Sequence, residues 1–200
     1  MSMNILVAGA TGKTGQQVVQ NLIDQGHLAT ALVRGGSDTG ALPKGVNLRH
    51  GDLTDLQSGV CDGMDAVIFA AGSGSSTGPE MTMKVDRDGA KRLIDLAREA
   101  GVKRFVLLSS IGADQSNPTG KIAHYLNAKH EADEHLKQSG LTYSILRPVA
   151  LTNEGRSENV ILGEGVDKSA HASRADVAAV LAEAATTGRY DGMAQDMQSA

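Results

Sequence analysis

The fold is decided by residues 5–15, which read Ile5-Leu6-Val7-Ala8-Gly9-Ala10-Thr11-Gly12-Lys13-Thr14-Gly15. The apolar residues at the start indicate a buried strand. The glycines that follow have GxxGxxG spacing, and residues 16–25 then carry apolar side chains at helical spacing. Glycines allow a tight turn and a close backbone approach to a pyrophosphate, and a helix N-terminus adds free N–H groups. Residues 5–25 therefore predict the strand–turn–helix unit of a dinucleotide site, although the glycines could instead only shape the turn.

Strand and helix patterns alternate along the rest of the chain. Further strands are expected at residues 28–33, 46–50, 66–71, 104–109, 141–146 and 193–197, and helices at residues 16–25, 53–60, 88–100, 122–138 and 173–185. Ser173 with Asp176 is expected to cap the last helix, and Gly101 to follow the end of helix 88–100. The alternation predicts an α/β fold of Rossmann type, a doubly wound parallel sheet with helices on both faces. We expect residues 1–200 to form one such domain, with a small C-terminal substrate region whose irregular residues 150–170 cover the site.

The composition narrows the class of function. A net charge of −4 at pH 7 offers no basic surplus for phosphate backbones, which argues against a nucleic-acid partner. The single cysteine, Cys61, suits a reducing cytosol and is expected to be half-buried. The first residues lack a signal-peptide pattern, no apolar run suits a membrane helix, and no metal-ligand spacing is present. We therefore expect a cytoplasmic monomer or homodimer that acts on a small molecule, without a membrane, nucleic-acid or metal partner.

The end of the second expected strand selects the cofactor. An acidic residue there would accept hydrogen bonds from the ribose hydroxyls of NAD, but this chain has Arg34. A guanidinium is a fixed fork that suits a 2′-phosphate, and Lys13 and Ser37 could add to the same pocket. The sequence therefore predicts NADP(H), with a solvated surface role for Arg34 as the alternative.

Two further strand ends are expected to contact the nucleotide. Asp52, followed by Leu53, comes after the third strand, where a carboxylate can accept from the adenine amino group. Equally, Asp52 or Thr54 could cap the helix expected at residues 53–60. Ala70-Ala71-Gly72 ends the fourth strand, and small residues there let the backbone pass under the ribose.

A Tyr and a Lys on the helix expected at residues 122–138 suggest proton chemistry. Tyr125 and Lys129 have YxxxK spacing, so their side chains lie on the same helix face. A nearby ammonium favours a phenolate, which lets a Tyr act as a general acid or base closer to neutral pH. Ser109 and Ser110 end the fifth strand at the same rim, where one hydroxyl could polarise a substrate carbonyl. His124 is expected to point away to the surface, and His171 to be an exposed loop residue.

These segments together resemble a known family over nearly the whole chain. The matching stretches are Gly9–Gly15, Gly51–Leu53, Val85-Asp86 with Gly89, Lys103–Ser110, Tyr125–Lys129, Arg147-Pro148 and Ser173–Ala178. They resemble an atypical short-chain dehydrogenase/reductase, of the NAD(P)-binding, epimerase-like subgroup that includes biliverdin-reductase-B-like proteins. The motifs are specific for the superfamily and do not specify a reaction.

The resemblance implies a role for individual residues. Ser110 would be the active-site serine, Tyr125 the acid/base and Lys129 its partner, which also contacts the nicotinamide ribose. The fourth position, usually Asn, falls on Asp86, and an ionised Asp cannot donate as an amide does. Pro148 would belong to the backbone segment that lies against the nicotinamide. The cofactor contacts expected from the motifs and the resemblance are Gly9, Thr11, Gly12, Lys13, Thr14, Gly15, Arg34, Asp52, Leu53, Ala70, Ala71, Gly72, Ser109, Tyr125, Lys129 and Pro148.

Three functions fit these expectations. The first is an NADP-dependent oxidoreductase for a small carbonyl, quinone-like or flavin-like substrate. The second is a nucleotide-sugar epimerase or dehydratase, against which the short region after the sixth strand counts. The third is a non-catalytic NADPH-sensing regulator that changes partners with its cofactor state.

Overall fold

The parallel sheet that the sequence predicts forms the centre of the protein. The computed structural model describes residues 1–74, 77–157 and 159–200. Within them, an eight-stranded sheet has the order β3-β2-β1-β4-β5-β6-β10-β8, in which β8 alone runs antiparallel, to its neighbour β10. The strands are β1 (Asn4–Ala8), β2 (Leu28–Val33), β3 (Asn47–His50), β4 (Ala66–Phe69), β5 (Arg104–Leu108), β6 (Thr142–Pro148), β8 (Val160–Leu162) and β10 (Met193–Ser199). The order 3-2-1-4-5-6 is that of a doubly wound dinucleotide-binding sheet, with its switch point between β1 and β4.

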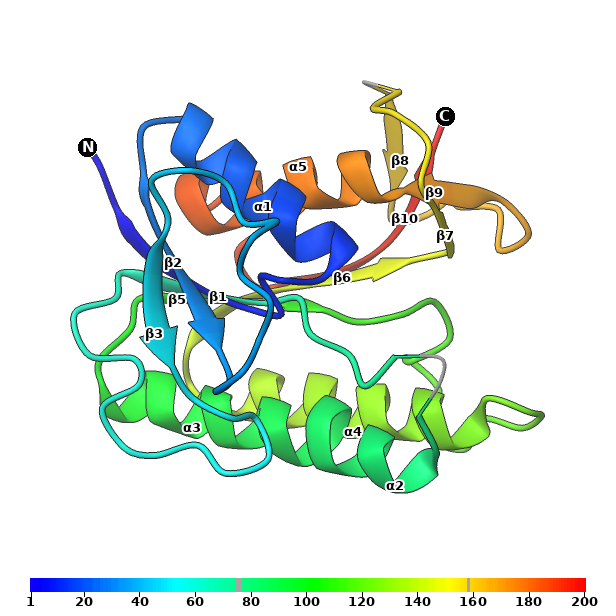
Figure 1. Ribbon diagram of the computed structural model, residues 1–200. Coiled ribbons are helices and arrows are strands. Elements are labelled where there is room, and N and C mark those ends of the chain that lie inside the picture. The colour runs from blue at the N-terminus through cyan, green and yellow to red at the C-terminus, as the bar shows by residue number, and fades with distance from the viewer. Residues whose placement is uncertain (75–76, 158) are drawn as a thin grey trace.

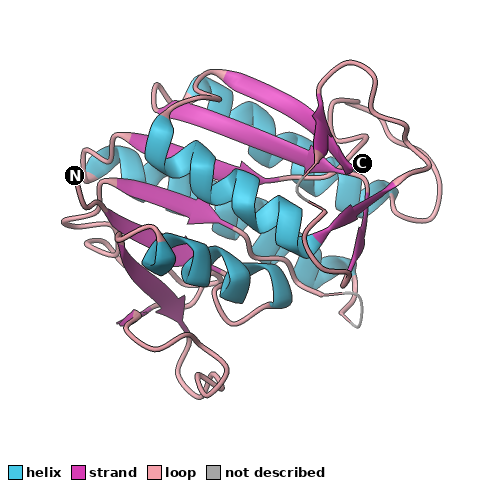
Figure 2. Cartoon of the chain, turned by 90° about the horizontal axis from the view of Figure 1, so that it is seen from above, coloured by secondary structure: helices cyan, strands magenta, loops and turns pink. Residues whose placement is uncertain are grey.

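Helices cover both faces of this sheet, as predicted (Figure 1). Helices α1 (Lys13–Asp24) and α5 (Arg174–Thr187) lie on one face, and α3 (Ala90–Glu99) and α4 (Ala123–Gln138) lie on the other. The view from above shows helices in front of the strands and behind them (Figure 2). Each layer has its own apolar core, one around Val18, Leu22 and Leu181 and one around Leu93, Phe105 and Leu136. The central strands β1, β2, β4 and β5 are buried on both sides, which is why they read as continuous apolar runs.

The caps of the helices follow the sequence signals. The Ser173 hydroxyl accepts a hydrogen bond from the Asp176 amide at 3.0 Å, so Ser173 caps α5 as predicted. Gly101 has a φ of +70° directly after the last turn of α3, and its amide bonds to the Arg98 carbonyl.

The helix predicted at residues 53–60 is wrong, because that segment is a series of turns. The Asp52 carboxylate accepts from both the amide and the hydroxyl of Thr54, at 2.9 and 2.8 Å, which closes a local turn in place of a helix cap. The Arg49 guanidinium donates a hydrogen bond to the Val60 carbonyl oxygen, and Gly59 adopts a φ of +84°. Leu56 and Val60 are nevertheless buried, so their apolar spacing reflects packing of a loop.

The helix expected at residues 88–100 begins earlier. A short helix α2 (Pro79–Thr82) continues through a π-helical segment η1 (Met83–Gly89) directly into α3. A π turn interrupts the 3.6-residue repeat, so the apolar periodicity does not reveal it, and π turns are frequent at functional sites. The segment η1 carries Asp86 and buries its side chain.

Two further expectations need correction. Residues 150–170, expected to be irregular, hold β8 and the short strand β7 (Ala150–Thr152), which pairs with β9 (His171–Ser173) in a second sheet. Cys61 is 1% exposed rather than half-buried, and burial raises the pKa of its thiol to about 12. The thiol is therefore protonated and unsuited to act as a nucleophile.

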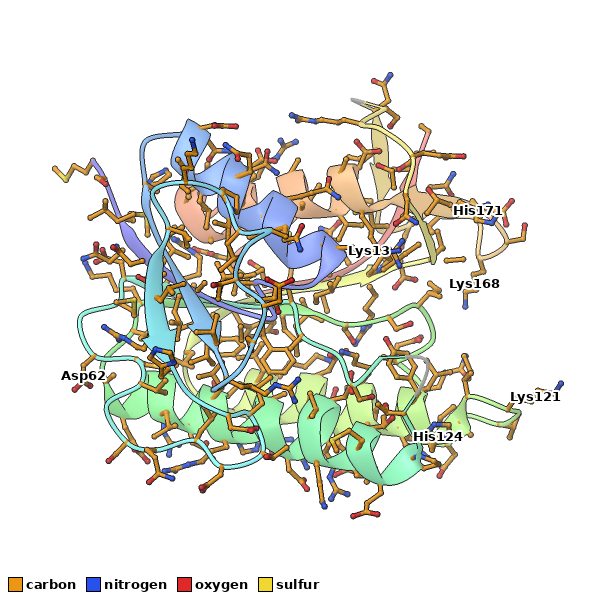
Figure 3. All side chains as sticks on the ribbon, viewed as in Figure 1. Lys13, Asp62, Lys121, His124, Lys168 and His171 are labelled. Carbon is orange, nitrogen blue, oxygen red and sulfur yellow. The ribbon has the colours of Figure 1, made fainter. Side chains whose placement is uncertain are left out.

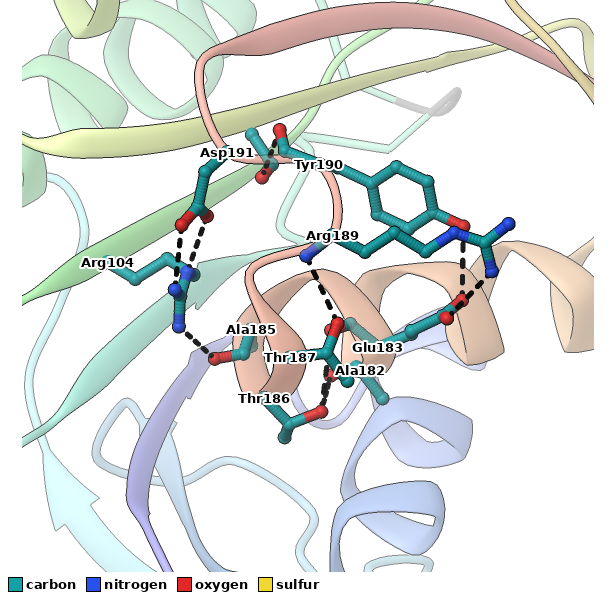
Figure 4. Close-up of polar contacts among 10 residues, drawn as sticks. Arg104, Ala182, Glu183, Ala185, Thr186, Thr187, Arg189, Tyr190 and Asp191 are labelled. Carbon is teal, nitrogen blue, oxygen red and sulfur yellow. Dashed lines mark hydrogen bonds and ion pairs between the residues drawn. The ribbon is translucent and has the colours of Figure 1, made fainter.

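Polar contacts fix the connection from α5 to β10 (Figure 4). The Arg104 guanidinium donates to both oxygens of Asp191, at 2.7 and 2.8 Å, and to the Ala185 carbonyl. Gly188 lies between them with a φ of +76°, and a Cβ there would be 2.6 Å from Arg104. These contacts hold the end of α5 against β5. Among the described residues, no helix is long and apolar enough to span a membrane.

Candidate functional site

Two adjoining cavities open at the carboxyl ends of the parallel strands. One, of about 450 Å³, lies beside the end of β2, and we call it the β2 cavity. The other, of about 690 Å³, lies beside the start of α4, and we call it the α4 cavity. Both are lined by Ala71, Gly72, Ser73 and Thr77, so the loop after β4 is a wall common to the two. Together they form a cleft at the place where sheets of this topology bind ligands.

The glycines of the first turn have different structural tasks. Gly9 has a φ of +82°, and a Cβ there would be 2.6 Å from the Cα of Ala71. A Cβ at Gly15 would overlap the carbonyl oxygen of Gly9. Gly12 is exposed, lines the α4 cavity, and would meet only the Gly9 oxygen, at 3.2 Å. Gly9 and Gly15 therefore allow close packing inside the protein, whereas Gly12 keeps the cavity open in front of α1.

Most of the predicted cofactor contacts lie along this cleft. The β2 cavity is lined by Gly9, Thr11, Arg34, Asp52 and Leu53, together with Ser37, and the α4 cavity by Gly12, Lys13, Thr14, Ala70 and Ser109. Lys13 lies in the α4 cavity, apart from Arg34, so the expectation that it joins Arg34 in one pocket is not supported. Hydrogen bonds from Thr54 lower the pKa of Asp52, with a smaller effect of the Arg34 charge, so Asp52 can act only as an acceptor.

The predicted Tyr–Lys pair lies in the wall of the α4 cavity with Asp86. The Lys129 ammonium is 3.1 Å from Asp86 Oδ1, donates to the Leu108 carbonyl at 3.2 Å, and lies 5.6 Å from the centre of the Tyr125 ring. Lys129 is 3% exposed. Burial disfavours its charge, but Tyr125 and Asp86 outweigh this effect, so the pKa of Lys129 is raised. The lysine is held as an ammonium beside the tyrosine.

Asp86 acts as an acceptor and a counter-ion, which suits a carboxylate better than an amide. Its second oxygen accepts the backbone amide of Ser73 at 2.9 Å, and the Ser73 hydroxyl lies 3.1 Å from that of Thr82. The side chain thus ties the loop after β4 to η1 and neutralises Lys129. An Asn in this position would leave the buried ammonium without its charge partner.

Three predicted residues do not line the cleft. Ser110 is half-buried, and its hydroxyl donates weakly to the Ile111 carbonyl at 3.4 Å. Ser109, its neighbour, lines the α4 cavity in its place. Pro148 is buried and binds the Ile111 amide through its carbonyl, and Gly15 is buried under the turn.

Several residues that line the α4 cavity were not predicted from the sequence. His124, expected at the surface, is half-buried and lines the α4 cavity with Ile122. It lies in the first turn of α4, where the helix end itself faces the cleft, so rotation away from Tyr125 does not remove it (Figure 3). Leu151 and Arg174 complete the wall from β7 and the start of α5. Of residues 150–170, Arg156, Val160 and Leu162 line a separate cavity beside α5. His171 is exposed, as expected, but it begins strand β9 instead of lying in a loop.

A buried ion pair lies behind Lys129. Asp133, one helical turn further along α4, accepts from Arg147 Nε of β6 at 2.9 Å, and the two side chains are 0% and 8% exposed. Burial raises the pKa of the Asp133 carboxyl, and Arg147 offsets this only in part. The charge of Lys129 also acts on Asp133. The pair therefore continues the row of charges that begins at Asp86.

Arg147→Ala should destabilise the protein strongly, because it leaves the Asp133 carboxylate buried without its partner. Removing one member of a buried pair costs about 3–5 kcal/mol. The free energy of unfolding is measured by urea titration. Arg189→Ala removes an arginine from an exposed pair with Glu183 and should leave the midpoint nearly unchanged. Equal small effects of both substitutions would show that the buried pair adds nothing.

The described residues contain no group of three or more His, Cys, Asp or Glu side chains placed to hold a metal ion. Among the described residues, the polar groups of the cleft are instead hydroxyls, cations and the two carboxylates of Asp52 and Asp86, of which Asp86 is paired with Lys129. Such a set suits an anionic organic ligand better than a cation.

Comparisons with known proteins agree with this geometry. The model of a family described as NAD(P)H-binding matches residues 9–187. YhfK of Bacillus subtilis, an uncharacterized sugar epimerase by name, is 37% identical over 184 residues, which cover 88% of this chain and 85% of that protein. The photosystem II assembly factor Ycf39 of Cyanophora paradoxa is 32% identical over 148 residues, which cover 72% of this chain but 44% of that protein.

Solved structures share the whole fold. A Bacillus halodurans protein named as an NAD-dependent epimerase/dehydratase is 33% identical, with a TM-score of 0.93 over 100% of this chain and 95% of its own. The oxidoreductase ylbE of Lactococcus lactis is 30% identical, with a TM-score of 0.85 over 99% of this chain and 91% of its own. The name of the first structure includes NAD, and the two names differ on the reaction.

Proposed function

Because this chain belongs to the NAD(P)H-binding family, we propose that it is an NADP(H)-dependent oxidoreductase that acts on a small carbonyl, quinone-like or flavin-like substrate. Family membership confirms the resemblance to epimerase-like short-chain dehydrogenase/reductases. The cofactor preference, the reaction and the substrate class are the proposal.

One observation carries this proposal. Tyr125 and Lys129 lie in the wall of the same cavity as Gly12, Lys13 and Thr14. A dinucleotide whose pyrophosphate lies against the start of α1 can therefore extend its nicotinamide end toward the tyrosine. The cleft residues fit such a group, because Gly12 leaves space at the helix start and the small residues Ala71 and Gly72 form the floor.

The residues of the chain have distinct tasks in this mechanism. NADPH, when bound, supplies a hydride. The Tyr125 hydroxyl supplies the proton that the reduced oxygen or nitrogen requires, and the Lys129 ammonium stabilises the charge left on the phenol oxygen. Asp86 and the Leu108 carbonyl hold the ammonium in place. Ser109 lines the same wall, but its hydroxyl is buried and acts on the Asp133 carboxyl, so Tyr125 is the hydroxyl of this wall to which the proposal gives the proton transfer.

The experiment that tests the proposal is a turnover assay with NADPH. Purified chain is mixed with a panel of aldehydes, quinones and free flavin, and NADPH oxidation is followed by absorbance. The proposal expects reduction of at least one class, with a strong dependence on Tyr125. Lack of NADPH oxidation across the panel by a chain that binds NADPH would contradict it.

Arg34→Ala should weaken NADPH binding by about 10-fold or more while NADH binding changes little. The reason is that the Arg34 guanidinium is expected to form charge-assisted hydrogen bonds to the 2′-phosphate, which NADPH has and NADH lacks. Arg34 is exposed and lines the β2 cavity, so its removal should leave the fold intact. Titration of both cofactors by fluorescence measures the two dissociation constants. Arg98→Ala, which removes an exposed arginine at the end of α3, is the matched control. Equal losses for NADPH and NADH would contradict the assignment.

A second function is favoured by the name of one relative, the assembly factor Ycf39. Under this alternative the chain is an NADPH-sensing regulator whose partner changes with cofactor state. A pull-down with NADPH, with NADP⁺ and without nucleotide distinguishes it, because an enzyme of the first kind does not require a partner that depends on the cofactor. The name of YhfK favours a sugar epimerase in the same way, and turnover of a nucleotide sugar would test that reading.

A further inference from the structure

One part of the α4 cavity wall is formed by residues outside the expected set of cofactor contacts. Ile122 and His124 come from the start of α4, Leu151 comes from β7, and Arg174 is the first residue of α5. The starts of α4 and α5 lie at the same end of the molecule, on opposite faces of the sheet (Figure 1). These residues line the same cavity as Tyr125, so a ligand that fills this cavity can contact both.

The charges of the cavity leave one guanidinium available here. Asp86 is the one carboxylate among the described lining residues, and its charge is taken by Lys129. Lys13 lies at the start of α1, next to Gly12, where the pyrophosphate is expected. Arg174 donates to the amide oxygen of Asn153 at 2.9 Å, and no carboxylate of the described residues lies within ion-pair distance of it. The hydrogen bond fixes the guanidinium and leaves its other N–H groups free to donate.

Apolar side chains accompany this cation. Ile122 is 56% exposed although it is a large apolar residue, and it lies at the cavity wall. Leu151, which is half-buried, and Pro79 add two further apolar side chains to the lining of the cavity. An exposed apolar side chain, in one cavity with a guanidinium that has no carboxylate partner among the described residues, suits a ligand that has an apolar body and an anionic end.

We propose that Arg174 binds the acidic group of the substrate, and that the substrate is an apolar organic anion, such as an aromatic carboxylate or sulfonate. This inference rests on the proposed function, because it assigns a substrate class to the same site. Ile122 and Leu151 pack against the apolar body, Arg174 pairs with the anion, and the reducible group is left near Tyr125. Guanidinium pairs with carboxylates in two parallel hydrogen bonds, which also orients the ligand.

The same guanidinium chemistry could serve a different source of anion, the pyrophosphate of the nucleotide. The two sources predict different effects of Arg174→Gln. If Arg174 binds the substrate, the substitution leaves NADP⁺ affinity unchanged. If it binds the pyrophosphate, NADP⁺ affinity falls and discrimination among substrates does not change.

The experiment is a calorimetric titration of 2-naphthoate and of the uncharged 2-naphthamide into the full chain, with and without saturating NADP⁺. A separate titration of NADP⁺ into the chain, made before the other two, tests the proposed function on its own. The unmodified chain should bind naphthoate about 10-fold or more tightly than naphthamide, since a charge-assisted pair is worth at least that factor. Arg174→Gln should bring the ratio near one, and Arg174→Lys should retain part of it. Lys168→Gln, at an exposed loop position outside the cavity, should keep the full ratio (Figure 3).

Several results would overturn the inference. These are equal affinities of the two ligands for the unmodified chain, binding of neither ligand, or a ratio that survives Arg174→Gln. A loss of NADP⁺ affinity in Arg174→Gln with an unchanged ratio would assign the residue to the pyrophosphate. If NADP⁺ does not bind, the proposed function fails, and the naphthoate-to-naphthamide ratio without nucleotide still decides the role of Arg174.

Discussion

Tyr125→Phe should lower turnover of a confirmed substrate by about 10²–10⁴-fold, the usual contribution of a positioned general acid or base. The substitution removes one hydroxyl and keeps the ring that lies beside Lys129. NADPH affinity should therefore change little. The loss should appear in kcat, because the proton is transferred in the reaction and not on binding.

The measurement is a steady-state assay of both variants together with NADPH titration. Tyr143→Phe is the matched control, because it removes the same hydroxyl from a half-buried tyrosine of β6 that does not line the cleft. It should retain full turnover. Full turnover in Tyr125→Phe would show that the bound nicotinamide and the shape of the pocket are enough for the chemistry.

The fold could be predicted because its signals are local. Residues 5–15 specify a strand, a glycine turn and a helix start within one short stretch, and alternating apolar patterns repeat the unit along the chain. Right-handed crossovers then place the connecting helices on the two faces of a doubly wound sheet. The helix predicted at residues 53–60 was wrong because Leu56 and Val60 are buried in a loop, where apolar spacing resembles that of a helix. Arg49 and Gly59 decide that conformation, and neither contributes to periodicity.

The site could be predicted where residues lie close in sequence or at strand ends. The spacing of Tyr125 and Lys129 is enough to place both on one face of α4. The sequence shows that Asp86 stands where the family usually has Asn. The reason for this difference appears only in the structure, where the π-helical segment η1 places Asp86 at 3.1 Å from Lys129. Ser109 and Ser110 alternate across a strand end, and sequence alone does not say which of them faces the cleft.

The part of the α4 cavity wall that contains Arg174 could not be predicted, because it depends on contacts between distant parts of the chain. Arg174 reaches the α4 cavity only because α5 begins beside β7, and Arg147 meets Asp133 across α4 and β6. In sequence, Arg174 is one polar residue in the first turn of a helix. Its place in one cavity with Ile122 appears only in the folded chain.

Gly12→Val should abolish NADPH binding, by about 100-fold or more, and leave the domain folded. Gly12 has a φ of −76° and a ψ of 162°, an extended conformation that a branched residue adopts readily. Its Cβ would meet only the Gly9 oxygen, at 3.2 Å, so the rest of the side chain would enter the α4 cavity. The valine would occupy the space at the start of α1 that the pyrophosphate requires.

Gly15→Ala is the contrasting variant in the same turn. A Cβ there would overlap the backbone of Gly9, and buried backbone cannot move aside as an exposed side chain can. The cost should therefore appear as lost stability, about 1–3 kcal/mol or more, as for overpacking of a well-packed core. Within one motif, Gly12 is thus expected to leave room for the ligand, and Gly15 to allow close packing of the backbone.

Calorimetric titration of NADPH into the unmodified chain and into Gly12→Val tests the central claim most directly, because it asks whether the cleft at the start of α1 is the nucleotide site. We predict saturable binding of one NADPH per chain to the unmodified protein, and no measurable heat from a Gly12→Val variant whose thermal unfolding shows an intact fold. A folded Gly12→Val variant that binds NADPH with unchanged affinity would contradict the account.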